Sequence, residues 1–355
     1  MTTVKIIAVI LTLPVLFSAW VRAEVPLYWV GEQLTRPQIS DLIAEHPFSL
    51  GSLSRKPIGI VYLCFDVGTS VNPGGLGYKG ADFDLTTGAG LKALQSYLNN
   101  TATTVIKNLQ ACHAQGIIVW DFDGEPSQGG WPTYIGAPNQ MMQADGGWWP
   151  AGVLTAYQDF VGKIKAAGFA VGCCLRCDTL IVKNGYPVKQ LTYQGTTTAK
   201  ADLLAKCSWA YQNLSCTLFY WDSYNLANGK PTYDQYLAHY VMEQLGQPLL
   251  ITCEEGSTLQ PPQEYINSYA DSPLYCPLPA ADAKWNVVPL DPSILAVYPA
   301  AFCCVNVDEG TGITPSNYSA LFDAFGAGQA LPLFQCWWGT ANIPYLKQMV
   351  AAGLW

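Results

Sequence analysis

The sequence predicts an α/β fold in which eight parallel strands, each followed by a helix, close into a (β/α)8 barrel. From residue 56 onward, short apolar runs alternate with longer amphipathic ones, as expected for parallel strands that are covered by helices. Eight such units in about 300 residues match the size of this barrel. An open doubly wound sheet is the alternative, but the first apolar run ends in 66–70 (DVGTS) without that fold's glycine-rich turn.

The expected strands are the apolar runs that stand between turn residues. They cover 58–68, 117–125, 169–178, 216–224, 248–256, the less distinct run 273–279, 302–310 and 331–339. The expected helices are the amphipathic stretches between them. They cover 87–115, 151–168, 198–214, 232–246, 261–270, 315–328 and 343 to about 352.

The N-terminal residues have the pattern of a secretory signal peptide over 1–23. Lys5 precedes an apolar run over 6–19, and Val21-Arg22-Ala23 supplies a cleavage site. A membrane anchor is the alternative, but the run is shorter than the roughly 20 residues that span a bilayer. We therefore expect a secreted or periplasmic protein, with 24–55 packed on the barrel and 56–355 forming the catalytic barrel.

The composition excludes several classes of protein. Half of the residues are apolar and only 12% are charged, against a typical charged share of about 25%. Disorder is excluded because it needs low hydrophobicity and high charge. The net charge of −8, without a cluster of Lys or Arg, argues against nucleic acid or an anionic membrane surface as a partner.

The 12 cysteines allow two interpretations. An even count in an exported chain suggests disulfides. However, several cysteines lie inside apolar runs, where cysteine packs as a small hydrophobic residue. These are Cys64, Cys173, Cys174, Cys253, Cys303, Cys304 and Cys336. We expect at most a few bridges and several buried thiols. The CxxC at 174–177 has no second CxxC or nearby His in the sequence, so we expect no metal or redox site there.

Acidic residues follow nearly every expected strand, and active sites of such barrels lie at these carboxyl ends. The acids are Asp66, Asp121, Asp123, Glu125, Asp178, Asp222, Glu254, Glu255, Asp308 and Glu309. Their neighbours include Arg176, Tyr220, Trp337 and Trp338. Any single acid has an equally ordinary role as a helix cap. Capping does not explain the Asp-x-Asp-x-Glu row at 121–125, which begins on a strand.

Alternation of side chains along a strand assigns these residues to faces. Asp121, Asp123 and Glu125 share one face, and Trp120 and Phe122 share the other. In the same way Arg176 goes with Asp178, Tyr220 with Asp222, Asn306 with Asp308, and Gln335 with Trp337. We expect the polar sets to face inward. The alternation favours Glu254 over Glu255 as the inward acid, although a bulge would reverse this.

A carboxylate-rich, aromatic-lined pocket with few histidines is typical of glycoside hydrolysis, which needs two carboxyl groups. We assign Asp222 as nucleophile or base and Glu254 as acid/base. Residues expected to contact the sugar are Asp66, Asp121, Asp123, Glu125, Arg176, Asp178, Tyr220, Asp308, Trp337 and Trp338. A serine hydrolase is not expected, because it needs a His base and usually a GxSxG elbow, and the sequence has no such elbow. No cofactor is expected, although an oxygen-only Ca²⁺ or Mg²⁺ site on the row at 121–125 is an alternative.

The segment 119–138 (VWDFDGEPSQGGWPTYIGAP) resembles bacterial (β/α)8 glycoside hydrolases, with a Trp-Asp-x-acid-Gly strand end and a Tyr-Ile-Gly-x-Pro loop. Asp123 stands where that family has Glu. The run 168–176 (GFAVGCCLR) is similar to the next strand of the same proteins. Phe219-Tyr220-Trp221-Asp222 resembles the fourth strand of α-galactosidase-like barrels, in which the Asp is the nucleophile. The resemblance implies a hydrolase fold and a carbohydrate substrate.

Two other functions remain open at this point. One is a carbohydrate-binding barrel without catalysis, and the other is a structural cell-surface protein. The distance between the two carboxyl groups separates catalysis from binding, because it is about 5–5.5 Å in retaining enzymes and about 6.5–9.5 Å in inverting ones. A large apolar patch without an acidic cleft would favour the structural protein.

Overall fold

The computed structural model describes residues 56–63, 83–120, 122, 151–176, 178–183, 186–192, 196–222, 241, 244–246, 250–253, 274–277, 303–308, 312–327 and 330–355. The signal peptide expected over 1–23 and the segment 24–55 lie outside these residues. So do five of the acids assigned to the site, namely Asp66, Asp121, Asp123, Glu125 and Glu254.

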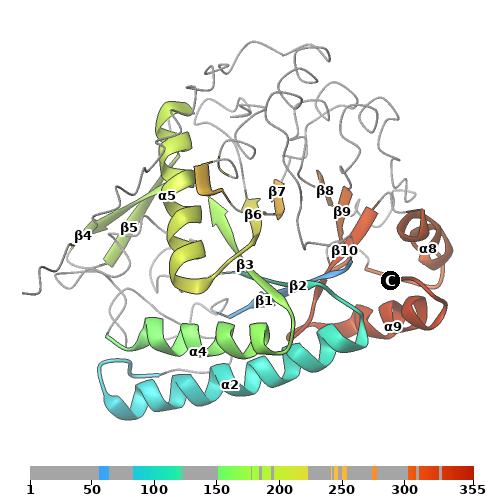
Figure 1. Ribbon diagram of the computed structural model, residues 1–355, viewed down its shortest axis with the longest axis horizontal. Coiled ribbons are helices and arrows are strands. Elements are labelled where there is room, and N and C mark those ends of the chain that lie inside the picture. Colours follow the sequence, from blue (N-terminus) through green and yellow to red (C-terminus); the bar gives the residue numbers. More distant parts are fainter. Residues whose placement is uncertain are drawn as a thin grey trace, which may run out of the picture.

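A curled sheet of parallel strands forms the centre of the molecule (Figure 1). Its strands are β1 (Ile58–Tyr62), β2 (Gly116–Trp120), β3 (Ala170–Arg176), β6 (Leu218–Asp222), β7 (Leu250–Cys253), β8 (Leu274–Pro277), β9 (Cys303–Asn306) and β10 (Ala330–Gln335). They pair in the order β1-β10-β9-β8-β7-β6-β3-β2, and β1 also pairs with β2, so the pairings run in a closed ring. The expected α/β class with a parallel sheet is confirmed.

The helices lie on the outside of the sheet. They are α2 (Gly88–Ala111), α4 (Val153–Ala166), α5 (Thr196–Leu214), α8 (Tyr318–Gly326) and α9 (Ile343–Ala351), and the short 3-10 helix η3 (Thr340–Asn342) precedes α9. Figure 1 shows α2 and α4 side by side against one side of the sheet. Among the described residues, no helix has both the length and the apolar character needed to cross a membrane.

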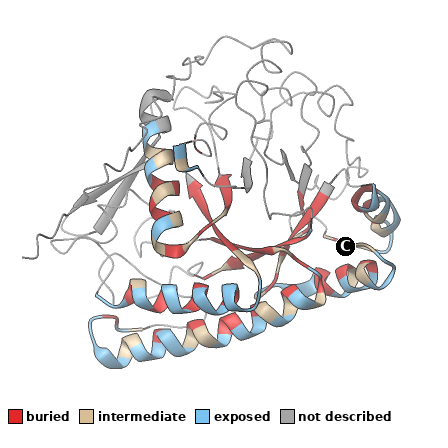
Figure 2. Cartoon of the chain, in the orientation of Figure 1, coloured by how far each residue is buried: buried red, intermediate tan, exposed pale blue. Residues whose placement is uncertain are grey.

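Helix α2 shows why this part of the sequence packs on the sheet. Its buried residues recur every three or four positions and form one apolar stripe, and they include Leu94, Leu98, Ala102, Val105 and Leu109. In Figure 2 the buried stripes of α2 and α4 face the sheet, and the opposite sides of both helices are exposed. Apolar spacing therefore fixes how these helices are oriented.

The ends of α2 are set by local chemistry. At its start, the Thr87 hydroxyl accepts a hydrogen bond of 3.0 Å from the backbone N–H of Gly90, as an N-cap residue does. At its end, the helix stops at Ala111 and His113 adopts a positive φ of 49°. Gly116 begins β2. The helix therefore ends at Ala111, before the end expected at residue 115.

The structure also contains an antiparallel hairpin between β3 and α5, which the sequence analysis did not predict. It consists of β4 (Asp178–Lys183) and β5 (Tyr186–Thr192), and in Figure 1 it projects from the side of the barrel. Asp178 therefore begins a hairpin strand and does not end the third barrel strand, which stops at Arg176. The missed signal is Asn184-Gly185 between two strand-like runs, a strong hairpin pattern.

The two faces of the sheet hold different residues. On the outer face, alternate strand residues pack in one apolar cluster with the helices, and they include Val119, Cys173, Leu175, Phe219, Trp221, Phe334 and Cys336. The intervening residues are also buried but lie outside that cluster, on the inner face, and they include Ile58, Ile60, Ile118, Cys174, Leu218, Leu331 and Leu333. The prediction that Cys173 and Cys174 point to opposite faces is confirmed.

Strands β3 and β6 approach each other closely at Gly172. A Cβ atom at this position would collide with the carbonyl oxygen of Leu218. Only glycine, which has no side chain, allows this approach. The close approach lies at the start of the paired stretch, which continues along both strands to Arg176 and Asp222.

Candidate active site

Three aromatic residues line the inner face near the carboxyl ends of β1, β2 and β6. Trp120 packs on Tyr220 with ring centroids 4.6 Å apart, and on Tyr62 at 5.5 Å. Trp120 and Tyr220 are buried and Tyr62 is half-buried. We call Tyr62, Trp120 and Tyr220 the aromatic wall. Rings of this kind offer flat apolar surfaces together with polar edges, which suits the faces of sugars.

The aromatic wall corrects the assignment of Trp120. Trp120 was expected to share a face with Phe122, as a sugar platform or as outward-facing core. In the structure Trp120 faces inward and Phe122 packs outside against Tyr157 of α4, with centroids 5.1 Å apart. The physical reason is that β2 ends at Trp120, so the strand alternation does not continue through the following residues. The inward position predicted for Asp121 rested on that alternation and lies outside the described residues.

The backbone brings Arg176 and Asp222 together. Each residue ends its strand, β3 or β6, and the two are registered opposite each other. Each also follows an inner-face residue by two positions along its strand, Cys174 or Tyr220. A cationic and an anionic residue thus hold registered positions at the carboxyl edge of the sheet.

The next strand leads toward the second predicted carboxylate. Cys253, the last residue of β7, is registered with Trp221, which precedes Asp222. Glu254 follows Cys253 in the sequence but lies outside the described residues. The distance between the Asp222 and Glu254 carboxyl groups therefore stays a prediction.

Asp308 is held by hydrogen bonds within the protein. Its Oδ1 accepts a hydrogen bond of 2.6 Å from Nδ2 of Asn342, and its Oδ2 accepts one from the backbone N–H of Gln335. Its own backbone N–H donates to Oδ1 of Asn306 at 3.1 Å. Asn342 also donates to the carbonyl of Val307 at 2.8 Å. The carboxylate thus fastens the end of β9 to β10, a role that sequence reasoning missed.

Gln335 was expected on an inward face, but the sequence analysis did not assign it to the site. It ends β10 and is registered with Ile60 of β1 on the inner face. Its side-chain oxygen Oε1 is buried and has no hydrogen-bond partner within the part of the chain that the structure describes. Most buried polar atoms in proteins have a partner, so this atom requires an explanation.

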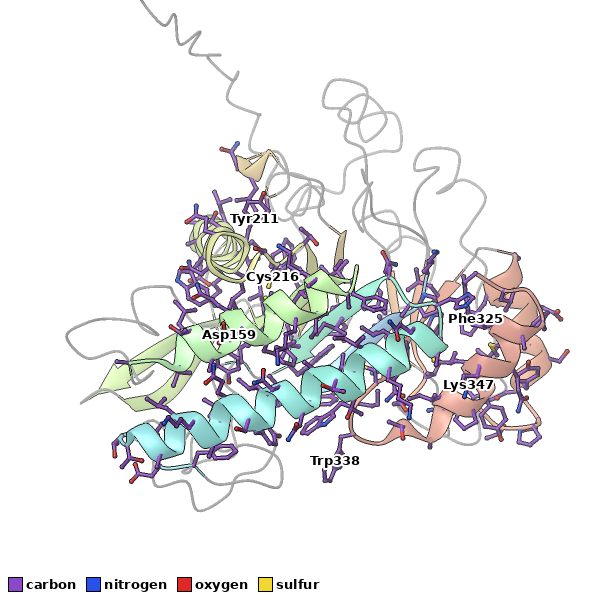
Figure 3. All side chains as sticks on the ribbon, turned by 60° about the horizontal axis from the view of Figure 1, so that its bottom comes forward. Asp159, Tyr211, Cys216, Phe325, Trp338 and Lys347 are labelled. Atoms are coloured by element: carbon purple, nitrogen blue, oxygen red, sulfur yellow. The ribbon has the colours of Figure 1, made fainter. Side chains whose placement is uncertain are left out.

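Trp337 and Trp338 lie away from the aromatic wall. Trp337 packs on Tyr97 of α2 with ring centroids 5.6 Å apart, and on Trp338 at 5.7 Å. Trp338 is 50% exposed, and Figure 3 shows it on the side of α2, directed away from the sheet. The predicted sharing of a face by Gln335 and Trp337 is therefore wrong, because β10 and its alternation end at Gln335.

Six cysteines whose side chains the structure describes are buried free thiols, which confirms the expectation of several core thiols. They are Cys112, Cys173, Cys174, Cys207, Cys216 and Cys336. Burial raises the pKa of the Cys112 thiol to about 12 and also raises the pKa values of Cys173, Cys207 and Cys336. Thiols in this state are protonated at neutral pH and unreactive. The described residues contain no group of three or more His, Cys, Asp or Glu suited to a metal ion.

Comparisons with known proteins add remote structural likenesses. No protein-family model matches the sequence, and no curated protein matches it. A GH27 β-L-arabinopyranosidase from Geobacillus stearothermophilus, solved with arabinose, is similar with a TM-score of 0.49 and 8% identity over 84% of this chain and 77% of that one. The α-L-fucosidase isoenzyme 1 of Paenibacillus thiaminolyticus has a TM-score of 0.41 and 10% identity over 90% and 76% of the two chains.

A third solved structure, an α-amylase from Geobacillus thermoleovorans in complex with acarbose, has a TM-score of 0.35 and 14% identity over 57% of this chain and 47% of that one. All three are named as glycoside-cleaving enzymes. With TM-scores below 0.5, these likenesses carry no argument about the activity of this chain. The residues of the site are therefore the basis for assigning a function to this chain.

Proposed function

We propose that this protein is a glycoside hydrolase whose active site lies at the carboxyl ends of the barrel strands. One observation carries the proposal: the aromatic wall lines the inner face directly below the registered pair Arg176 and Asp222. A glycosidase needs a carboxylate at the scissile bond, and a sugar site combines apolar surface with a few placed polar groups. This edge of the sheet offers both.

In the proposed mechanism, Asp222 acts as nucleophile or base and Glu254 as acid/base. Arg176, registered opposite Asp222, is a proposed contact to sugar hydroxyls. Protonation of the leaving oxygen by Glu254 would then complete the pair. Asp66, Asp121, Asp123 and Glu125 remain proposed contacts to sugar hydroxyls.

The proposal extends to the parts of the chain outside the described residues. We propose that the eight strands belong to a complete (β/α)8 barrel and that residues 1–23 direct export. The pattern at Val21-Arg22-Ala23 then makes Glu24 the first residue of the mature chain. N-terminal sequencing of the protein that its host secretes tests this, and a membrane-bound chain that keeps residues 1–23 would contradict it.

The activity is tested by incubating the purified protein with a panel of polysaccharides and measuring new reducing ends. We expect at least one polysaccharide to be cleaved, and Asp222→Asn to abolish the cleavage while the variant still binds that polysaccharide. Binding by the wild type without cleavage would contradict the proposal and indicate a carbohydrate-binding barrel. A wild type that neither binds nor cleaves any of the polysaccharides would favour the structural cell-surface protein.

A further inference from the structure

We infer that the side-chain amide of Gln335 binds one hydroxyl group of the sugar substrate and so helps to set which sugar is accepted. This inference rests on the proposed glycosidase function and adds a residue that the sequence analysis did not assign to the site. It is carried by three features of the described residues: an unpartnered buried oxygen, a fixed backbone and a neighbouring aromatic surface.

The first feature is the unpartnered oxygen. Gln335 Oε1 is buried and accepts no hydrogen bond from the described residues. Leaving a buried acceptor unpaired destabilises the folded protein, so such an atom is retained where something else benefits. A hydroxyl group suits this position because it donates a hydrogen bond to Oε1.

The second feature is the way the backbone of Gln335 is held. Its N–H donates to the Asp308 carboxylate, and that carboxylate accepts a second hydrogen bond from Asn342 at 2.6 Å. Asn342 is itself fixed, because its Oδ1 accepts from the backbone N–H of Ile313 at 2.7 Å. The amide therefore starts from a fixed backbone, and Asp308 acts as a positioning residue for Gln335. A ligand-binding group that is held in advance loses less freedom on binding.

The third feature is the position of Gln335 relative to the aromatic wall. Gln335 is registered with Ile60 on β1, and Tyr62 lies two residues further along the same face of that strand. Tyr62 is the half-buried member of the aromatic wall. A sugar ring lying on the wall would thus have a hydrogen-bonding amide on the neighbouring strand. Apolar contact with a few oriented polar groups is how such pockets gain specificity.

The stability test uses Gln335→Met, which keeps the length of the side chain and removes the unpartnered amide. We expect its thermal midpoint to be unchanged or higher than that of the wild type. Gln95→Met is the matched control, because the Gln95 amide is exposed and donates to Asp159 at 2.7 Å. A marked fall of the midpoint in Gln335→Met alone would show that the amide stabilises the fold, and would overturn the inference.

The binding test uses titration calorimetry with D-glucose, D-galactose, D-mannose and D-xylose and with the monodeoxy derivatives of each. For the sugar that binds, we expect one deoxy derivative to bind the wild type at least ~5-fold more weakly than its parent. Gln335→Met should bind the parent more weakly and lose that discrimination, whereas Gln95→Met should behave as the wild type. Discrimination that survives in Gln335→Met would overturn the inference.

A second variant covers the case in which Gln335→Met does not fold. Gln335→Glu keeps an acceptor oxygen at the same reach, so we expect it to keep the discrimination, and its loss would overturn the inference. The two levels of the proposal fail in different ways. A wild type that cleaves a polysaccharide, with Gln335→Met discriminating normally, refutes only the role of Gln335. A wild type that neither binds these sugars nor releases reducing ends refutes the glycosidase and the role of Gln335 together.

Discussion

The two faces of the same strands differ in the kinds of residue that they bring together. On the outer face, Phe219, Trp221 and Cys336 are completely buried against the helices. On the inner face, the aromatic wall, the ends of β3 and β6, and Gln335 bring aromatic and polar groups together at the carboxyl edge. The outer face is built mainly from apolar contacts with the helices, and the inner face brings polar groups to the carboxyl edge, among them the Gln335 oxygen.

The two faces therefore contribute separately to stability and to function. The outer face contributes the buried apolar area that drives folding, and its thiols are protected by burial. The inner edge holds the groups that would act on a ligand, including one that costs stability. We therefore expect outer-face changes to alter the unfolding free energy and inner-edge changes to alter turnover, with little exchange between the two effects.

The largest expected effect is on the outer face. Phe219 is completely buried, and Phe219→Ala leaves a cavity between the sheet and the helices, so we expect a loss of about 3–5 kcal/mol in the free energy of unfolding. Urea denaturation followed by circular dichroism measures this. Phe322→Ala, at a half-buried position on α8, is the control and should cost clearly less. Equal losses would mean that the two positions are packed alike.

The next effect is on the inner edge. Asp222→Asn and Glu254→Gln are near-isosteric, so both variants should keep their thermal midpoints while each loses at least ~100-fold in turnover, as expected for acid–base or nucleophilic groups. Steady-state rates on the polysaccharide that the wild type cleaves provide the measurement. Asp323→Asn, on the exposed side of α8, should leave the rate unchanged. Full turnover in both variants would make the assigned pair wrong.

A smaller effect concerns the thiol of Cys112, which is buried in the apolar cluster on the outer face of the sheet. Burial raises the pKa of Cys112 from 9.0 to about 12, so above pH 9 the unfolded chain loses this proton before the folded chain does. The stabilisation is complete below pH 9 and is lost as the pH rises toward 12. We expect the urea midpoint of the wild type to fall with pH in this range more steeply than that of Cys112→Ala. Identical slopes would show that Cys112 ionises normally in the folded protein.

The smallest effect is expected at the exposed tryptophan. Trp338 is 50% exposed, so Trp338→Ala should change the free energy of unfolding by no more than about 0.5 kcal/mol. Trp337→Ala removes a ring that packs on Tyr97 and should cost more. Because Trp338 lies away from the aromatic wall, we expect Trp338→Ala to leave KM unchanged. A raised KM at unchanged kcat would place Trp338 in the site, as the sequence suggested.

The sequence predicted the elements well where burial repeats along the chain. Strands β1, β2, β3 and β6 fall inside the expected runs, apart from Gly116 at the start of β2, because strands buried on both faces need continuous apolar residues. Their ends were placed too late. The run expected over 58–68 is a strand only over Ile58–Tyr62, because an apolar run does not reveal where backbone pairing stops. The hairpin was missed because its alternating strands interrupt the β/α pattern.

The site was predicted in part, because position depends on register as well as on sequence. Polar residues near the strand ends are visible in the sequence, but the end of β3 at Arg176 and its pairing with Asp222 follow from the register of β3 with β6. Alternation failed at Trp120, where the strand ends. The roles of Asp308 and Gln335 depend on contacts between β9, β10 and η3, and no pattern within one segment encodes such contacts.

The pairing of β1 with β10 has a consequence for how the chain matures. The first and the last strands of the ring lie near opposite ends of the sequence, so the sheet keeps two open edges until the final strand has been synthesised and has paired. Such contacts between distant segments form slowly, and open edges invite pairing with other chains. We therefore expect a ribosome-bound or truncated chain without β10 to be prone to aggregation. Chaperones that bind nascent chains should protect this chain most during that interval.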